Sequence, residues 1–467
     1  MRKAAPVRPP AALTIAGSDS GGGAGVQADL KTMEAHGVFG TSVITATTAQ
    51  NTRGVRSSFV LPVEEIRAQY EAVAEDFDLG AVKTGMLATR EVIEAVTELL
   101  ADFEGPVVVD PVMVAASGDR LLTEEAEDAY GDLLGEATLV TPNADEAAVL
   151  AGVDVTDAES AREVGEALLE TGVEAALVKG GHLDDDISSR GSHLGGETVI
   201  DTLATEEGVE RFEHPRIDTE ASHGSGCTLA SAIASRLALG EPLDAAVAAS
   251  VSFMERAVRY SLDVGEGPGA VHHLVALREE ADRHRTIERV EGIVERFVDR
   301  DVSALVPEVG MNVVGATPYA EAVPETAAVE GRITRTLSGV KPNRGVRLGA
   351  SSHVARFLLA AREVDPSIRF AVNCRFDDDV EDALAALDGP TSEFDRAAEP
   401  AAVKEREGST MQWGARKAFE SADESPAAVI DRGEVGKEAI VKLLASDVET
   451  LVERTLTLCD AVESADA

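Results

Sequence analysis

Short apolar runs alternate with amphipathic segments over residues 12–273. Runs of three or four residues have the length of buried strands at 13–16, 42–45, 81–83, 107–110, 138–141 and 176–179. Helical periodicity occupies most of the intervals, at residues 62–75, 90–102, 123–134 and 158–171. Because strands that alternate with helices form sheets covered on both faces, this pattern predicts an α/β fold with a mostly parallel sheet flanked by helices.

A second pattern follows a long charged segment. Residues 274–300 predict a charged helix, which we expect at the junction of two domains, 1–275 and 284–467. Beyond it, strand-like runs at 313–314, 345–348, 369–373 and 427–430 alternate with helical segments at 352–363 and 436–458. The second domain is therefore also predicted to be α/β.

The charge of the chain is strongly acidic and evenly spread. It carries 84 Asp and Glu against 42 Lys and Arg, a net charge of −42, without an acidic tail. A spread excess of this size is typical of a surface adapted to high salt, where screening removes most self-repulsion. It disfavours nucleic acid as a partner of the whole chain.

The remaining composition predicts a cytoplasmic protein. No run of 18 apolar residues suggests a membrane span, and residues 1–10 lack the apolar core of a signal peptide. Cys227, Cys374 and Cys459 are far apart and lack metal-ligand spacing, which fits a reducing compartment without disulfide bonds. The sequence does not decide whether the chain forms a homo-oligomer.

Unusual polar residues and glycines cluster where the predicted strands end, which is where parallel sheets bind ligands. They are residues 17–25, Gln50, residues 85–86, Asp110, Asn143 and residues 179–181. No P-loop motif occurs, and the glycine run at 21–25 does not have dinucleotide-binding spacing.

The segment at 223–228, His-Gly-Ser-Gly-Cys-Thr, precedes an alanine-rich helical segment that starts at Leu229. Glycines there allow backbone N–H groups to converge, and a helix start adds partial positive charge. Gly224, Ser225 and Gly226 can therefore stabilise a phosphoryl group in transfer. The same turn is also compatible with a simple helix cap.

Residues 16–29, AGSDSGGGAGVQAD, resemble the opening signature of the hydroxymethylpyrimidine/phosphomethylpyrimidine kinases of thiamine biosynthesis, which have a ribokinase-like fold. The resemblance extends over residues 12–273. Its further motifs occur in the family's order, at 48–52, 83–87, 110–113, 141–143, 179–182 and 224–227.

The resemblance implies a substrate pocket in which Gln50 binds the aminopyrimidine edge, lined by Gly17, Asp29 and Met86. Cys227 takes the position of the aspartate base of most ribokinase-like enzymes and could accept the substrate proton as a thiolate. Each residue also has a structural interpretation: Gln50 as a buried amide, Asp29 as a helix-face carboxylate and Cys227 as an inert buried thiol.

The same resemblance implies binding of ATP and Mg²⁺. Asn143 and Glu146 would help to hold Mg²⁺ near the ATP phosphates, and Lys179 would contact those phosphates. An Asn-x-x-Glu segment is also a common helix start, and Lys179 could be a solvated lysine. The implied reactions phosphorylate an alcohol and then extend the monophosphate to a diphosphate.

The second domain contains one basic segment. Residues 332–356 hold six positive charges and His353 but no acidic residue. Arginine forks match phosphate oxygens, so the segment predicts a ligand with several phosphates. The candidates for phosphate binding are Lys341, Arg344, Arg347 and Arg356. A surface paired with acids from elsewhere in the fold is the alternative.

Residues 284–462 resemble the ThiN-type thiamine-phosphate synthase domain at 331–333, 341–347, 351–356, 411–414 and 431–438. Such a domain joins hydroxymethylpyrimidine diphosphate to a thiazole phosphate and releases pyrophosphate. Arg332 and His353 match its catalytic residues, and Asp431 and Glu438 would support Mg²⁺ or form a turn.

We therefore expect a bifunctional enzyme that acts on small molecules: hydroxymethylpyrimidine, its phosphates and thiazole phosphate. Two alternatives stay open from the sequence. The second domain could be a ligand sensor, although no basic helix-turn-helix accompanies it. The kinase could act on a related alcohol such as pyridoxal, against which Gln50 and Cys227 argue.

Overall fold

The computed structural model describes residues 3, 5–114, 121–180, 198–404, 409–422, 424–434 and 436–465. The chain divides into two compact units, Met1–Leu277 and Arg278–Ala467. The division lies within helix α10 (Val275–Arg300). The presence of this helix confirms the charged helix predicted at residues 274–300.

The N-terminal unit is built on a nine-stranded sheet with the order β3-β2-β1-β4-β5-β6-β7-β8-β9. The strands are β1 (Ala11–Ser18), β2 (Phe39–Asn51), β3 (Gly54–Val60), β4 (Leu79–Thr84), β5 (Val107–Val109), β6 (Leu139–Val140), β7 (Ala175–Val178), β8 (Thr198–Thr205) and β9 (Gly208–Pro215). From β2 through β7, spatial neighbours pair in parallel, whereas β3, β8 and β9 join the sheet as antiparallel strands. The predicted mostly parallel α/β sheet is confirmed.

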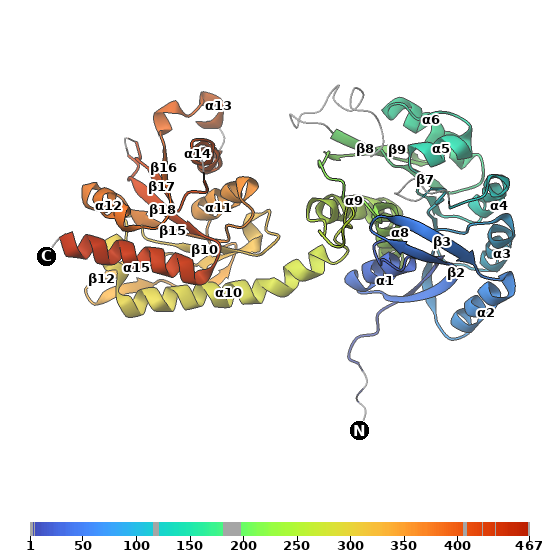
Figure 1. Ribbon diagram of the computed structural model, residues 1–467, viewed down its shortest axis with the longest axis horizontal. Coiled ribbons are helices and arrows are strands. Elements are labelled where there is room, and N and C mark those ends of the chain that lie inside the picture. Colours follow the sequence, from blue (N-terminus) through green and yellow to red (C-terminus); the bar gives the residue numbers. More distant parts are fainter. Residues whose placement is uncertain are drawn as a thin grey trace. The chain divides into compact units, whose positions relative to one another are not determined.

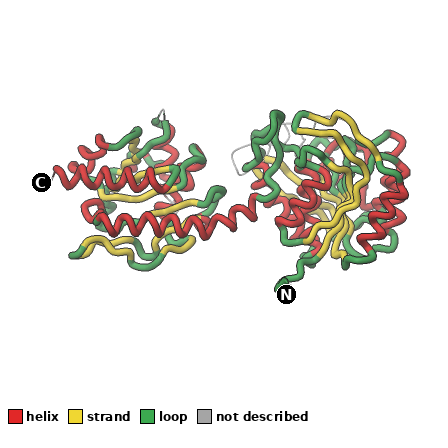
Figure 2. The backbone as a smooth tube through the Cα atoms, turned by 60° about the horizontal axis from the view of Figure 1, so that its bottom comes forward, coloured by secondary structure: helices red, strands yellow, loops and turns green. Residues whose placement is uncertain are grey.

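Helices cover both faces of this sheet (Figure 2). They are α1 (Gly25–Ala35), α2 (Val63–Ala74), α3 (Arg90–Leu100), α4 (Tyr130–Leu134), α5 (Ala144–Ala151), α6 (Ala158–Leu169), α8 (Ser225–Ala238) and α9 (Leu243–Arg259). Alternate side chains of a strand point to opposite faces. Leu13 and Val82 accordingly face the apolar core with α2, α3, α4 and α6, whereas Thr14 and Lys83 face α1 and α8. No described helix is long and apolar enough to cross a membrane.

Some features of the N-terminal unit were not predicted. Strand β3 is largely exposed and forms a hairpin with β2, whose register shifts between Ala49 and Gln50. The segment predicted as one helix at 123–134 begins as a 3₁₀ helix, η1 (Glu124–Ala129), and continues as α4.

The C-terminal unit contains a seven-stranded sheet with the order β14-β11-β10-β15-β18-β17-β16 and a separate hairpin, β12-β13 (Figure 1). Its strands are β10 (Val313–Ala316), β11 (Thr326–Val329), β12 (Ile333–Thr336), β13 (Gly339–Pro342), β14 (Val346–Leu348), β15 (Phe370–Arg375), β16 (Thr391–Phe394), β17 (Ala428–Asp431) and β18 (Ile440–Ala445). Only β16 and β17 pair in parallel among these described strands.

Two apolar cores enclose the larger sheet. One core joins it to α10 and α15, and the other joins it to α11 and α14. Besides α10, the helices are α11 (His353–Val364), α12 (Asp378–Ala383), α13 (Ala401–Lys404), α14 (Ser409–Glu420) and α15 (Val448–Ala465). Short 3₁₀ turns complete the unit: η2 (Val302–Leu305), η3 (Val323–Glu325), η4 (Leu384–Ala386) and η5 (Arg396–Ala398).

The predicted helix at 436–458 is wrong in its first part, because residues 440–445 form strand β18. Val441 and Leu443 lie in one core and Leu444 lies in the other, so the strand is buried on both faces. A short apolar run buried on both faces has no alternation to distinguish it from a helix. The helix starts after Asp447, whose carboxylate accepts a hydrogen bond from the Thr450 N–H at 2.9 Å.

Candidate functional sites

A cleft of about 650 Å³ lies at the carboxyl ends of β1, β4, β5, β6 and β7. The predicted residues that line it are Gly17, Gln50, Met86, Asn143, Glu146, Lys179, Gly224, Ser225, Gly226 and Cys227. Parallel strands direct their carboxyl ends to one edge, so segments distant in sequence meet there. Asp110 also lines the cleft; it was predicted as part of the strand-end cluster and of the motif at 110–113, without a chemical role.

The Gly-Ser-Gly-Cys turn is the first turn of a helix. Helix α8 starts at Ser225, earlier than the predicted start at Leu229, and Gly224 caps it in a left-handed conformation with φ of 84°. A Cβ on Gly224 would lie 1.8 Å from the Gly23 carbonyl oxygen, so no other residue fits without movement. The first N–H groups of a helix lack intrahelical acceptors and favour an anion.

Asp19 fixes the glycine loop that packs against this turn. Its carboxylate accepts the N–H groups of Gly21, Gly23 and Ala24 at 2.8 to 2.9 Å and contacts His223 Nε2 at 3.2 Å. Burial alone would raise the pKa of Asp19, but the His223 and backbone hydrogen bonds lower it below its usual value. Sequence reasoning assigned no role to this pair. The signal was an aspartate that opens a glycine run, which is typical of a turn built on carboxylate-to-backbone hydrogen bonds.

Lys179 lies between two carboxylates. Its Nζ is 3.3 Å from Asp110 Oδ1 and 4.0 Å from Glu146 Oε2. Burial raises the pKa of Glu146 to about 7; the charge of Lys179 opposes this shift, and Asp110 adds to it. Burial would lower the pKa of Lys179, but the two carboxylates raise it above its usual value. Of the motif at 179–182, Gly181 and His182 lie outside the described residues.

Asn143 and Glu146 form a capping box at the start of α5, with reciprocal hydrogen bonds of 2.8 Å between side chain and backbone. The helix-start interpretation is therefore correct, and both side chains also line the cleft. No cluster of three metal-ligating side chains occurs among the described residues. Mg²⁺, however, commonly binds one or two carboxylates together with substrate phosphates. Asp110 Oδ2 would be 3.5 Å from a Cβ at Gly226, so this oxygen faces the turn. The carboxylate oxygens of Asp110 and Glu146 therefore fit Mg²⁺.

The predicted substrate pocket forms the other part of the cleft. A Cβ on Gly17 would approach Met86 Sδ to 2.9 Å, so glycine allows the Met86 side chain to pack there. Gln50 lies at the register shift of β2, and its Oε1 accepts a hydrogen bond from the Thr48 hydroxyl at 3.2 Å.

Asp29 does not line the cleft. It is buried and binds Lys83 Nζ at 3.0 Å, with further hydrogen bonds from the hydroxyls of Thr14 at 2.6 Å and Ser231 at 2.7 Å. The ion pair connects α1, α8 and the sheet. Asp29 is therefore a structural carboxylate in this geometry and has no direct contact with the pocket predicted for it.

Cys227 lines the cleft, but its surroundings disfavour the predicted thiolate. Burial raises the pKa of the thiol to about 12; the charge of Lys83 lowers it, and the carboxylates of Asp29 and Asp110 raise it further. The helix start therefore does not overcome desolvation. Cys227, Cys374 and Cys459 are all unpaired, as predicted.

The C-terminal unit has a cationic site at the start of α11. His353 is the first residue of that helix. Burial lowers its pKa, and the charges of Arg332, Arg356, Lys442 and Arg396 lower it further. Arg332 has a left-handed backbone with φ of 72°, and its guanidinium donates a hydrogen bond to the Val309 carbonyl. The charges of Arg332 and Arg356 thus act on His353 in the structure.

The rest of the basic segment has other surroundings. Arg344 and Arg347 both pair with Glu330, at 3.7 Å and 3.2 Å. For these two residues the alternative of a surface paired with acids from elsewhere in the fold holds, because the β11–β14 pairing brings Glu330 beside them. Lys341 is exposed on β13.

Asp431 and Glu438 already have partners in the protein. Asp431 accepts two hydrogen bonds of 2.8 Å from Arg396 and one of 3.1 Å from the Gly433 N–H. Glu438 accepts the N–H groups of Glu308 and Val309 at 2.8 Å and 3.1 Å. Neither arrangement indicates a metal ligand, and the turn interpretation of Asp431 holds.

Sequence reasoning missed Lys442, which lies on β18. Its side chain is buried, 3.6 Å from Asp431 Oδ2, and its ammonium is 4.7 Å from the centre of the Phe357 ring. Burial lowers its pKa. No signal pointed to it, because the segment was predicted to be an amphipathic helix.

Comparison with known proteins assigns both units. Residues 19–272 match the phosphomethylpyrimidine kinase family, and residues 289–457 match the thiamine-phosphate synthase ThiN family. A hydroxymethylpyrimidine/phosphomethylpyrimidine kinase of Streptomyces coelicolor is 48% identical over 275 residues, which cover 59% of this chain and 98% of that protein.

Two further matches are a bifunctional protein and a kinase of known structure. The thiamine biosynthesis bifunctional protein ThiED of Geobacter sulfurreducens is 44% identical over 273 residues, 58% of this chain and 54% of that protein. The structure of an ADP complex of Bacillus subtilis pyridoxal kinase matches with a TM-score of 0.51 and 31% identity, over 58% of this chain and 99% of that one. The chain belongs to the phosphomethylpyrimidine kinase family, and its residues 289–457 match the thiamine-phosphate synthase ThiN family.

Proposed function

We propose that this chain catalyses consecutive steps of thiamine phosphate formation. The kinase unit transfers phosphoryl groups from ATP to hydroxymethylpyrimidine and then to its monophosphate. The synthase unit joins the diphosphate to hydroxyethylthiazole phosphate and releases pyrophosphate. The observation that carries the kinase assignment is a single cleft in which Gln50, Lys179 and the helix-start turn at Gly224 converge.

Phosphoryl transfer requires stabilisation of charge on the moving group more than covalent chemistry. The backbone N–H groups of Gly224 and Gly226 receive the phosphoryl oxygens at the positive end of α8, whereas the Ser225 N–H donates to the Ser222 carbonyl at 3.1 Å. Lys179 supplies a cationic side chain beside this turn, since its Nζ would lie 3.3 Å from a Cβ at Gly226. Asp110 and Glu146 would hold Mg²⁺, which supplies neutralisation of the ATP phosphates when bound.

The alcohol binds in the part of the cleft formed by Gln50, Gly17 and Met86. The Gln50 amide presents both a donor and an acceptor, as an aminopyrimidine edge requires. Cys227 adjoins the reacting hydroxyl as a thiol. In a loose transition state the hydroxyl loses its proton late, so the proton can pass to a phosphoryl oxygen and no thiolate is needed at rest.

In the synthase unit, the bond between the pyrimidine methylene carbon and the diphosphate oxygen breaks, and pyrophosphate leaves with the bonding electrons. The thiazole nitrogen lone pair forms the new bond to that carbon. Arg332 and Arg356 stabilise the departing negative charge, and Lys442 and Arg396 add to the positive potential around His353. An anion that binds beside His353 offsets the nearby positive charges and makes the imidazole easier to protonate. His353 is therefore suited to bind or orient the leaving diphosphate.

Pyridoxal phosphorylation is a second candidate activity for the kinase unit, since a pyridoxal kinase shares its fold at 31% identity. The two substrates differ at the ring edge that Gln50 faces. We expect kcat/KM for hydroxymethylpyrimidine to exceed that for pyridoxal, and Gln50→Ala to reduce this preference. A higher kcat/KM for pyridoxal in the wild type would make the second candidate the correct one.

The whole proposal is tested by incubating the purified chain in high salt with hydroxymethylpyrimidine, MgATP and hydroxyethylthiazole phosphate. Thiamine phosphate and pyrophosphate are the expected products. Accumulation of the pyrimidine diphosphate alone would refute the synthase assignment and leave the kinase assignment intact. Absence of any phosphorylated pyrimidine would refute the kinase assignment.

A further inference from the structure

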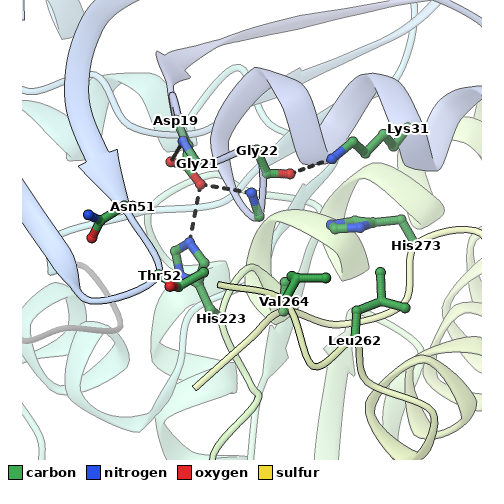
Figure 3. Close-up of a pocket in the computed structure, with 12 residues that line it drawn as sticks. Asp19, Gly21, Gly22, Lys31, Asn51, Thr52, His223, Leu262, Val264 and His273 are labelled. Carbon is green, nitrogen blue, oxygen red and sulfur yellow. Dashed lines mark hydrogen bonds and ion pairs between the residues drawn. The ribbon is translucent and has the colours of Figure 1, made fainter. Parts of the chain in front are cut away.

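A second, smaller cavity of about 200 Å³ adjoins the glycine loop of the kinase unit (Figure 3). The backbone of residues 21–23 forms one wall, and the hairpin residues Asn51 and Thr52 form another. Leu262, Val264 and Ala270 give it an apolar side. The proposed kinase reaction does not use this cavity.

His273 points a buried nitrogen into this cavity (Figure 3). The side chain is 3% exposed, and its Nε2 has no hydrogen-bond partner among the residues that the structure describes. Buried polar atoms are nearly always satisfied by protein, water or ligand. Burial, with the charge of Lys31, lowers the pKa of His273 to about 4, so the ring is neutral and one nitrogen is available to a ligand.

The other polar groups of the cavity are mainly donors. Lys31 Nζ donates to the Gly22 carbonyl at 2.6 Å, which leaves two of its three N–H bonds. The Thr52 hydroxyl accepts from the Gly267 N–H at 3.1 Å and keeps its own proton to donate. Asp19 is the carboxylate of the lining, and its oxygens are already taken by three backbone N–H groups and His223. The cavity therefore suits a ligand that accepts hydrogen bonds.

We propose that this cavity binds a small oxyanion of the phosphate class, held by Lys31 and His273. Lys31 provides the charge, and the neutral imidazole exchanges one hydrogen bond with a phosphate oxygen or hydroxyl. The cavity volume of about 200 Å³ suits an ion with one or two phosphate groups. The site adjoins the kinase cleft but is separate from it, because Lys31 and His273 do not line that cleft.

Histidine NMR of the full chain tests this site, with inorganic phosphate as the probe and sodium chloride at equal ionic strength as the reference. His214 lines the large cleft but not the small cavity, and His273 lines the small cavity but not the large cleft. Their resonances therefore report the two sites separately. His273→Asn assigns the reporter signal. Phosphate is expected to shift the His273 resonance saturably and to raise its pKa. A shift of His214 alone, or of neither histidine, would overturn the proposal.

Variants of Lys31 give a second test. Lys31→Met should weaken the phosphate affinity reported by His273 by about tenfold or more, as expected when a charge-assisted hydrogen bond is lost. Lys31→Arg should retain most of it, and Lys417→Met, an exposed lysine of the synthase unit, should change nothing. Equal affinity in Lys31→Met and wild type contradicts the assignment. A parallel titration with pyrophosphate identifies which of the two anions the cavity prefers.

Discussion

Lys179 of the kinase cleft has two carboxylates beside it, Asp110 and Glu146, whereas His353 of the synthase unit faces four cationic side chains. In the proposed reaction the kinase cleft holds ATP, a divalent cation and a neutral alcohol, so a balanced set of charges and a backbone anion site suit it. The synthase site must stabilise a leaving diphosphate, so an excess of positive side chains suits it.

The two proposed sites also differ in the groups from which they are built. The kinase site relies on backbone groups at a helix start, which only glycine at position 224 allows. The synthase site relies on side chains from α11, β18, η5 and the turn at Arg332. Changes to backbone geometry should therefore harm the kinase most, and changes to side-chain charge should harm the synthase most.

The largest effect is expected from Gly224→Ala. The new Cβ would collide with the Gly23 carbonyl and also strain a left-handed backbone, so the anion site is displaced. We expect kinase kcat/KM to fall by roughly 100-fold or more, as when an oxyanion-stabilising donor is removed. Synthase activity with supplied diphosphate should be unchanged.

Gly240→Ala is the matched control for this variant. Gly240 has a similar left-handed φ of 82°, but a Cβ there meets nothing within 4 Å. It shares the backbone strain without the collision and should leave kinase activity near wild type. Equal losses in the two variants would show that strain alone, and not the geometry of the turn, explains the effect.

A smaller effect is expected from Lys442→Met in the synthase site. Removing this buried charge lowers the positive potential around His353, so synthase kcat/KM should fall by roughly tenfold. Asp431 keeps its paired hydrogen bonds with Arg396, so its buried charge stays compensated and folding should be preserved. Kinase activity of the same preparation is the internal control. Unchanged synthase activity would show that the charge of Lys442 does not contribute to the reaction.

The smallest effect concerns pH and Glu146. Because burial raises the pKa of Glu146 to about 7, its carboxylate is largely protonated below neutrality. If the charged form supports Mg²⁺, kinase kcat/KM should fall roughly threefold from pH 7.5 to 6.5, and Glu146→Gln should lack this inflection. A pH profile with the same inflection in Glu146→Gln would contradict this role.

The same shift has a consequence for stability with a definite sign. The folded state binds the Glu146 proton more tightly than the unfolded chain, whose glutamate has a pKa of 4.5. The stabilisation is therefore fully present below pH 4.5 and is lost as pH rises through about 7. Thermal denaturation of wild type should show a loss over this range that is absent in Glu146→Gln.

The parallel part of the kinase sheet could be predicted because each buried strand alternates with an amphipathic helix. Strand β3 could not, since it is mostly exposed and lacks an apolar run. Strand β18 was assigned to a helix because a short run buried on both faces carries no period. The hydrophobic pattern of a sequence identifies a helix or strand only where one face of that element is more apolar than the other.

The kinase site was largely predictable because its residues follow predicted strand ends, and a shared sheet edge brings such positions together. The ionisation of Cys227 was not predictable, since it depends on burial and on the charges of Lys83, Asp29 and Asp110 in three dimensions. The pairing of Arg347 with Glu330 was also hidden, because it depends on the register of β11 against β14.

The central claim is that one chain carries two separate active sites that act in sequence. The most direct test mixes two inactive variants, Gly224→Ala and Arg332→Ala, and supplies hydroxymethylpyrimidine, MgATP and hydroxyethylthiazole phosphate. Each variant alone should yield little thiamine phosphate, whereas the mixture should form it at a substantial fraction of the wild-type rate. Full activity of Arg332→Ala alone, or a mixture that accumulates only the pyrimidine diphosphate, would contradict the claim.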